Sequence, residues 1–139
     1  MARYTITPNE GLDSVRFGEP RTGLRERLGS FTSFRRGDSE SPTDQFPEKG
    51  LLLSFNQDDS LELIEVTPEA QVTYQGITLF GRPYRHVLGD LREHGIEGTE
   101  DDQGVEFTDL GFALFNPAPD DPEEEVHGVS VFPRDYYSM

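Results

Sequence analysis

An internal repeat constrains this chain more than any other feature of its sequence. Two segments, 17–28 and 80–91, both open with Phe-Gly-x-Pro and carry apolar residues at the same two later positions. A glycine turn followed by proline, and then by apolar residues four positions apart, is typical of a short amphipathic helix closed by a further glycine. The defining residues are Phe17, Gly18, Pro20, Leu24, Leu28 and Gly29 in the first segment and Phe80, Gly81, Pro83, Val87, Leu91 and Gly95 in the second.

Each predicted helix is followed by two apolar stretches that favour antiparallel strands. In the first half these are residues 51–56 and 61–66, separated by the polar turn 57–60. In the second half they are residues 112–116 and 126–132, separated by a longer acidic turn. Phe-Asn ends the first strand of both pairs, which strengthens the correspondence between the halves.

These elements predict an α+β fold. We expect a single compact domain, 1–139, made of two repeats at roughly 1–70 and 71–139. Each repeat would pack one short helix on an antiparallel sheet. The boundary falls near residues 68–75, and two short strands between 71 and 80 open the second repeat.

Two further expectations concern the sheets. Alternation predicts that Leu61 and Leu63 face the core while the neighbouring glutamates face solvent. Residues 36–49 are rich in Ser, Pro, Asp and Gly, and residues 97–103 are acidic, so both segments are predicted to be loops.

The charge of the chain is strongly negative and unevenly distributed. The sequence has 12 Lys and Arg against 27 Asp and Glu, a net charge of −15. No Lys or Arg lies between Arg92 and Arg134, whereas arginines gather in residues 16–36. Direct nucleic-acid binding needs a basic footprint and is therefore disfavoured, while a basic protein partner would be attracted. Solubility, or the habitat of the organism, explains the same acidity equally well.

Cysteine content and hydropathy limit the compartment. The chain has no cysteine, so disulfides and thiolate metal sites are excluded. No apolar stretch approaches the ~18 residues of a membrane span, and the first residues do not lead into a secretory signal. We expect a cytoplasmic protein that does not contact membranes.

No constellation of residues points to catalysis. His86 and His94 are too far apart to form an i,i+4 metal pair, and Lys49 lies in a polar segment. No serine sits in a nucleophile elbow. The acidic stretches 58–59 and 100–104 lack the twelve-residue calcium pattern. A hydrolase built on paired carboxylates has no positive support, so we expect no enzyme activity, no metal and no cofactor.

Positions that are equivalent in the repeat but differ in chemistry are candidates for function. Arg21 and Arg25 of the first helix correspond to Tyr84 and Leu88 of the second. One interpretation is a guanidinium pair that grips a carboxylate, a phosphate or a partner surface. The other is a solvated helix face bridged to Glu26 or to a neighbouring acidic loop.

The acids of the second half are the candidates for contact with a protein partner. They would steer and pair with a basic groove, although a solvated loop tip has the same composition. Such a contact also needs apolar anchors, for which Phe31, Phe34, Tyr136 and Tyr137 are candidates. The acids expected to contact the partner are Asp101, Asp102, Asp120, Asp121, Glu123, Glu124 and Glu125.

The Phe-Gly-x-Pro turn, short helix and antiparallel sheet, repeated twice, resemble the tandem-repeat architecture of beta-lactamase-inhibitor-protein-like domains. In size and acidity the chain is also similar to immunity proteins of bacterial polymorphic-toxin systems. These resemblances imply a non-catalytic inhibitor, a cytosolic immunity protein that binds and occludes a basic cognate toxin. The alternative function is a ligand-binding or regulatory module in which Arg21 and Arg25 hold an anionic small molecule.

Overall fold

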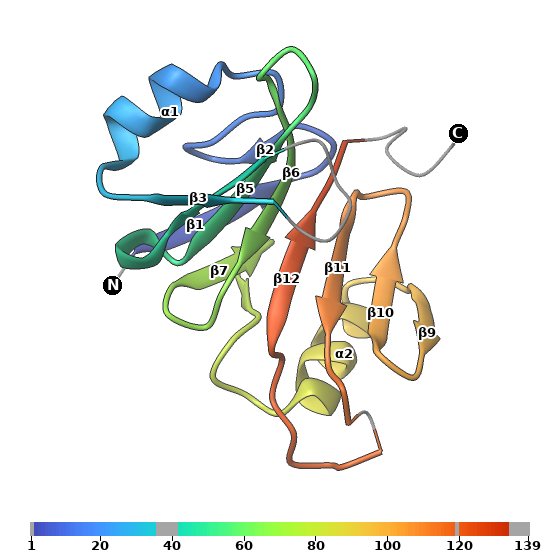
Figure 1. The fold of residues 1–139 in the computed structure, drawn as a ribbon. Helices are drawn as coiled ribbons and strands as arrows, with labels where there is room; N and C mark the ends of the chain where they lie inside the picture. The colour runs from blue at the N-terminus through green and yellow to red at the C-terminus, as the bar shows by residue number, and fades with distance from the viewer. Residues whose placement is uncertain (1, 36–41, 119, 134–139) are drawn as a thin grey trace.

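The computed structural model describes residues 2–35, 42–118 and 120–133 and has the predicted α+β class (Figure 1). Two α-helices accompany an eight-stranded and a four-stranded sheet. In chain order the elements are β1 (Arg3–Thr7), β2 (Gly11–Leu12), α1 (Arg21–Leu28), β3 (Thr32–Phe34), β4 (Thr43–Phe46), the 3-10 helix η1 (Pro47–Lys49), β5 (Leu51–Phe55), β6 (Leu61–Val66), β7 (Gln71–Tyr74), β8 (Ile77–Thr78), α2 (Tyr84–Glu93), β9 (Thr99–Asp101), β10 (Gly104–Phe107), β11 (Phe112–Phe115) and β12 (Gly128–Val131).

Both predicted helices are present, and each starts directly after the proline of its Phe-Gly-x-Pro turn. The predicted apolar stripe of α2 is buried throughout, since Tyr84 and Leu88 join Val87 and Leu91 in the core. In α1 only Leu24 is fully buried. The side of α1 that faces the sheet is therefore largely polar, whereas the corresponding side of α2 is apolar.

The eight-stranded sheet consists of two groups of four strands that meet in its middle. Its order is β3-β4-β5-β6-β12-β11-β10-β9, and every pairing in it is antiparallel. The first group follows α1 and the second follows α2, and they join where β6 pairs with β12. The smaller sheet has the order β2-β1-β7-β8. In it the N-terminal strand β1 pairs in parallel with β7, a strand from the middle of the chain.

One apolar core lies on one face of the large sheet. Alternate residues of its strands, such as Leu53, Ile64 and Leu114, are buried in the same cluster as Leu24 of α1 and Leu91 of α2. The residues between them on these strands face the other way and are less buried. The large sheet thus has a covered face, against the helices and the small sheet, and an exposed face.

The predicted orientation of Leu63 is wrong. Leu61 is buried as expected, but the next buried residue of β6 is Ile64, and Leu63 lies on the exposed face with Ser54. The register of β5 and β6 shifts between Ser54 and Phe55, which places an extra residue on β6. A bulge of this kind reverses the phase of alternation, so a strict period of two fails across it.

The two predicted loops each contain a strand. Within residues 36–49 the structure has β4 and η1, and within residues 97–103 it has β9. β4 is held between β3 and β5 by ladder hydrogen bonds, and β9 pairs with β10 at the sheet edge. Pairing with neighbours overrides the local composition of both segments.

A matched pair of glycine substitutions tests this packing. Gly104 has φ of 139°, and an added Cβ would lie 1.9 Å from the carbonyl oxygen of Leu114. Gly104→Ala is therefore expected to lower the free energy of unfolding by at least about 2 kcal/mol. Gly89 lies inside α2, where an added Cβ meets no described atom beyond its own helix within 4 Å. Gly89→Ala should raise the free energy of unfolding by about 0.5–1 kcal/mol. Urea unfolding of the two variants measures both changes.

Candidate partner-binding surface

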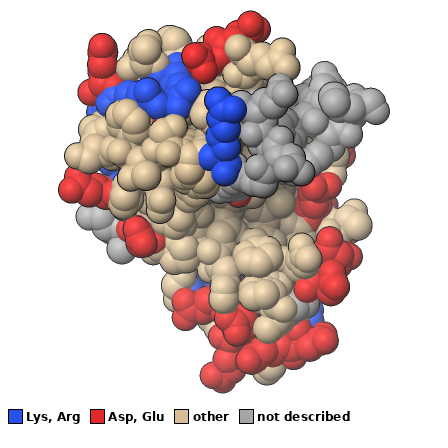
Figure 2. All heavy atoms as spheres, in the orientation of Figure 1, with Lys and Arg blue, Asp and Glu red and all other residues tan. Residues whose placement is uncertain are grey.

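The acids proposed from the sequence come together at one end of the molecule. Asp101 and Asp102 follow α2 and lie on and after β9, whereas Asp120 and Asp121 belong to the loop between β11 and β12. Glu100, which was not among the proposed acids, lies beside them on β9. The two segments face each other across a hollow of about 830 Å³, which Arg85 also lines. Figure 2 shows acidic side chains gathered at this end of the molecule.

A second hollow continues this surface along the β11–β12 loop. It has a volume of about 430 Å³ and shares Asp121 with the first hollow. His127 and Pro68 also line it. We call the surface around both hollows the acidic end, made up of Glu100, Asp101, Asp102, Asp120, Asp121, Glu123, Glu124 and Glu125.

Short polar side chains fix the loops that carry these acids. Oδ1 of Asp101 accepts the backbone N–H of Gln103 at 2.8 Å, and Oδ1 of Asp121 accepts that of Glu123 at 3.0 Å. Oδ1 of the buried Asn116 accepts the N–H of Ala118 at 2.9 Å. Such turns set the backbone direction where each loop leaves its strand. Local hydrogen bonds from Asp101, Asn116 and Asp121 therefore shape the two loops that carry the acidic end.

Most of the negative charge at the acidic end is not neutralised within the described part of the chain. Glu100 forms ion pairs with Arg92 at 2.9 Å and with Arg85 at 3.7 Å, and Glu124 contacts His127. No Lys or Arg in the described ranges forms an ion pair with the four aspartates of the acidic end. Although Arg85 lines the same hollow, the net field there is negative and favours cations and basic surfaces.

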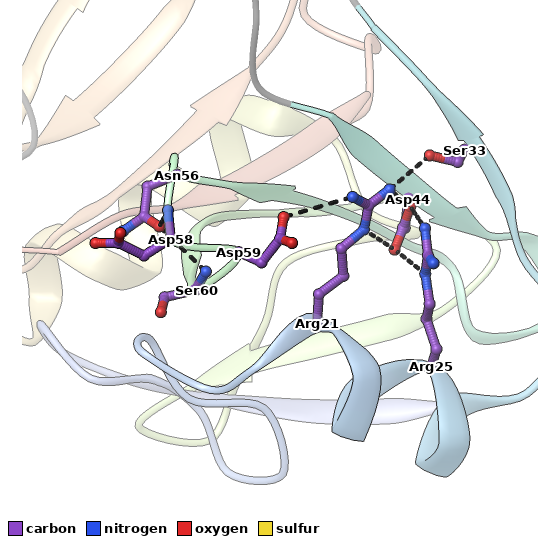
Figure 3. A network of polar contacts seen from close by, with 8 residues as sticks. All are labelled: Arg21, Arg25, Ser33, Asp44, Asn56, Asp58, Asp59 and Ser60. Atoms are coloured by element: carbon purple, nitrogen blue, oxygen red, sulfur yellow. Dashed lines mark hydrogen bonds and ion pairs between the residues drawn. The ribbon is translucent and has the colours of Figure 1, made fainter.

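Arg21 and Arg25, the proposed anion-binding pair, grip a carboxylate of the chain itself (Figure 3). Arg21 donates from Nε and Nη2 to the two oxygens of Asp44 at 3.2 and 3.1 Å. Arg25 donates from Nε and Nη2 to the same oxygens at 2.8 and 3.0 Å. The Asp44 side chain is 0% exposed, and those of Arg21 and Arg25 are 17% and 29% exposed. Two bidentate contacts thus use the acceptor capacity of one buried carboxylate.

These contacts stabilise the ionised form of Asp44. Burial by itself raises the pKa of this carboxyl, but hydrogen bonds with Arg25, Arg21 and Ser33 outweigh burial and hold the pKa below its ordinary value. The hydrogen bond to Asp44 raises the pKa of Arg25 in turn. We call Arg21, Arg25 and Asp44 the buried ion cluster.

The predicted bridge from these arginines to a neighbouring acidic loop also exists. Asp59, in the turn between β5 and β6, lies 3.5 Å from Arg21 Nη1. Arg21 and Arg25 also stack on Phe55 and Phe31, at 5.5 and 4.2 Å from the ring centroids. With these partners in place, the pair holds an internal anion and anchors α1 to the sheet.

The aromatic candidates differ in how they are used. Phe31 is 40% exposed, yet it packs on Phe46 at 5.8 Å and under Arg25. Phe34 is half-buried, and Tyr136 and Tyr137 lie outside the described residues. Sequence reasoning missed Phe115, which is 45% exposed at the end of β11.

Phe115 was missed because the Phe-Asn motif aligns it with Phe55, which is fully buried. Relative to the Phe-Asn motif, the alternation of buried residues in β11 is shifted by one residue from that in β5. Asn116, rather than Phe115, takes the buried position, and this leaves the phenyl ring on the exposed face. A period of two counted from Phe112 places Leu114 and residue 116 on the buried face and Phe115 on the exposed face. This period is the sequence signal that could have identified Phe115.

Comparisons with protein-family models, with curated proteins and with solved structures give no match to this chain. Within the described ranges, no three His, Asp or Glu side chains are grouped so that they could hold a metal ion. Neither described helix has the length and apolar character that crossing a membrane requires.

Proposed function

We propose that this protein is a non-catalytic inhibitor, a cytosolic immunity protein that binds a basic bacterial toxin and occludes its functional surface through the acidic end. The observation that carries the proposal is the convergence of two acidic segments, about 20 residues apart in sequence, around a hollow of about 830 Å³. A second hollow, of about 430 Å³, continues this surface along the β11–β12 loop. A concave, uncompensated negative surface both attracts a basic partner and receives its side chains.

The charge distribution supports a protein partner over a nucleic acid. The acidic end would repel phosphates, Asp44 engages Arg21 and Arg25 of α1, and Arg27 of the same helix pairs with Glu19. Hollows of a few hundred Å³ on a charged surface suit the long side chains of Lys and Arg. Occlusion by direct contact needs no catalytic group on the inhibitor.

We also infer that the chain is a tandem repeat with its boundary near residue 70. Each half has a strand pair in the small sheet, then a helix, then four strands of the large sheet. The prolines before the helices make matching bridges, Pro20 with Ser60 and Pro83 with Glu125. Both bridges run from the helix start to the last hairpin of the half.

The repeat assigns apolar counterparts to the buried ion cluster. Asp44 lies opposite Leu53 in β4 and β5, and Val105 lies opposite Leu114 in β10 and β11. The arginines at 21 and 25 correspond to Tyr84 and Leu88, both of which are buried. At equivalent positions, the first half therefore has two Arg and one Asp, and the second half has Tyr, Leu and Val.

The proposal is tested by isolating the partner and measuring its toxicity. Tagged protein is recovered from cells of the source organism at about 50 and 500 mM salt, between which the Debye length shrinks about threefold. We expect one basic protein in near-stoichiometric amount at low salt and much less at high salt. Expressed alone in a test bacterium, that protein should arrest growth, and co-expression of this chain should restore it. A partner that is acidic, or whose toxicity this chain leaves unchanged, would falsify the proposal.

A further inference from the structure

We infer that Phe115 is the apolar anchor of the contact with the partner, so that the binding surface runs from the acidic end onto the exposed face of β11 and β12. This inference rests on the proposed function. It adds the part of the surface that determines how long the complex lasts, and it specifies what the partner must present to that surface.

Phe115 is exposed at the end of β11. Within β11, Phe112 and Leu114 point into the core, while Ala113 and Phe115 lie on the exposed face. Phe115 pairs across the ladder with Gly128, and Ala113 pairs with Ser130. Because these neighbours have small side chains or none, the ring stands above the sheet rather than between other side chains.

Phe115 and Phe31 differ in how far other side chains of the protein cover them. These are the two large apolar residues exposed in the described part of the chain. Phe31 is already occupied, because it packs on Phe46 and lies under the guanidinium of Arg25. Phe115 lies nearly perpendicular to the His127 ring, with centroids 6.2 Å apart and an interplanar angle of 84°. The residue nevertheless keeps 45% of its surface exposed, and this surface is open to another molecule.

The surface around Phe115 is continuous with the acidic end. A hollow of about 180 Å³ beside Phe115 is lined by Asp101 and Glu106, and Asp101 also lines the 830 Å³ hollow. On the other side, His127 contacts both Phe115 and Glu124 and lines the 430 Å³ hollow. The ring therefore lies where the three hollows approach one another.

Charge complementarity defines the occupant. Among the described Lys, Arg, Asp and Glu side chains that line the three hollows, Arg85 is the one cation and all others are acidic. The partner is therefore a protein surface on which Lys and Arg surround an apolar recess that receives the phenyl ring. A central aromatic residue within a charged rim is the usual anatomy of an interface hot spot.

The test places the photo-crosslinking amino acid p-benzoylphenylalanine at three positions, one at a time, in the source organism. Phe115 tests the inference, Phe31 is the matched control, and Pro122 reports on the acidic end without removing an acid. We expect adducts with one and the same basic protein from positions 115 and 122 and none from position 31. Adducts from 122 without 115 would overturn the role of Phe115 and leave the proposed function standing. The absence of adducts from all three positions would count against both.

The purified crosslinked protein then gives the quantitative result. Phe115→Ala should weaken binding at least about tenfold, mainly through faster dissociation, while Phe31→Ala changes it less than about twofold. Circular dichroism establishes that both variants remain folded, and Phe115→Tyr, which keeps the ring, should bind nearly as well as wild type. Equal affinity of Phe115→Ala and wild type would overturn the inference even if crosslinking succeeds.

Discussion

Asp44→Asn is expected to lower the free energy of unfolding by about 3 kcal/mol, the lower end of the range for breaking a buried ion pair. The substitution removes the charge that Arg21 and Arg25 share and leaves an amide at a position with no solvent exposure. The lower end applies because both guanidiniums keep partial access to water. Urea unfolding followed by circular dichroism measures the loss.

The control is Asp59→Asn, which also removes a carboxylate near Arg21. Its side chain is 65% exposed, so the pair is worth less than about 1 kcal/mol. Similar losses for the two variants would mean that the buried ion cluster has no special weight in holding α1 on the sheet.

The apolar counterparts in the second half provide a rescue. Asp44→Val alone should destabilise as much as Asp44→Asn or more, because two arginines then face an apolar side chain. Adding Arg21→Tyr and Arg25→Leu reproduces the Tyr84, Leu88 and Val105 site, and replacement of buried ion clusters by apolar side chains is often neutral or stabilising. We expect the triple variant to return to within about 1–2 kcal/mol of wild type. A triple variant no more stable than Asp44→Val would argue against the proposed repeat.

The pH dependence of the free energy of unfolding tests the buried ion cluster independently. Because the folded pKa of Asp44 is lowered, its contribution is fully present above its unfolded pKa of about 4 and is lost as the pH falls through the lower folded pKa. The stability difference between wild type and Asp44→Asn should therefore be constant from about pH 5 to 7. It should shrink below about pH 4.

Neutralising the acidic end should slow association with the basic partner by at least about tenfold at low salt, with a much smaller effect near 500 mM. Electrostatic steering acts on the encounter rate, which is why the association rate constant is the quantity to follow, by stopped-flow fluorescence. The substitutions are Asp101→Asn, Asp102→Asn, Asp120→Asn and Asp121→Asn.

A matched variant removes the same number of negative charges elsewhere. Its substitutions are Glu10→Gln, Glu26→Gln, Glu48→Gln and Asp58→Asn, all at exposed positions that line none of the three hollows. We expect its association rate constant to stay within about threefold of wild type. If both variants slow association equally, net charge rather than the acidic end brings the partner in.

The sequence predicted the elements whose signals are local. Both helices were located by a proline, an apolar stripe and a glycine, and β6 was predicted with its observed bounds, Leu61–Val66. The orientation of Leu63 within β6 was not predictable, because the bulge depends on how β5 and β6 pair. Register across a sheet is a relation between strands, and alternation within one strand does not contain it.

Asp44 and Phe115 were missed for opposite reasons. Asp44 belongs to a segment whose composition indicates a loop, and an aspartate is unfavourable in a strand until two arginines, 19 and 23 residues before it, meet it. Phe115 matches a residue of the first half that is buried, so the repeat argued against its exposure. The acids of the acidic end were predictable as a group, since their convergence needs only that the loops after α2 and β11 reach the same end.

The position of β12 bears on how the protein folds as it is synthesised. β12 is the last described strand to leave the ribosome, yet it lies in the middle of the large sheet, between β6 and β11. The helix and four large-sheet strands of the first half can form early during synthesis. The edge of β6 that later pairs with β12 then stays unpaired until β12 emerges. An edge left open in a growing chain invites pairing with other nascent chains. Two glutamates of β6, Glu62 and Glu65, place charge on that edge strand until β12 pairs with it.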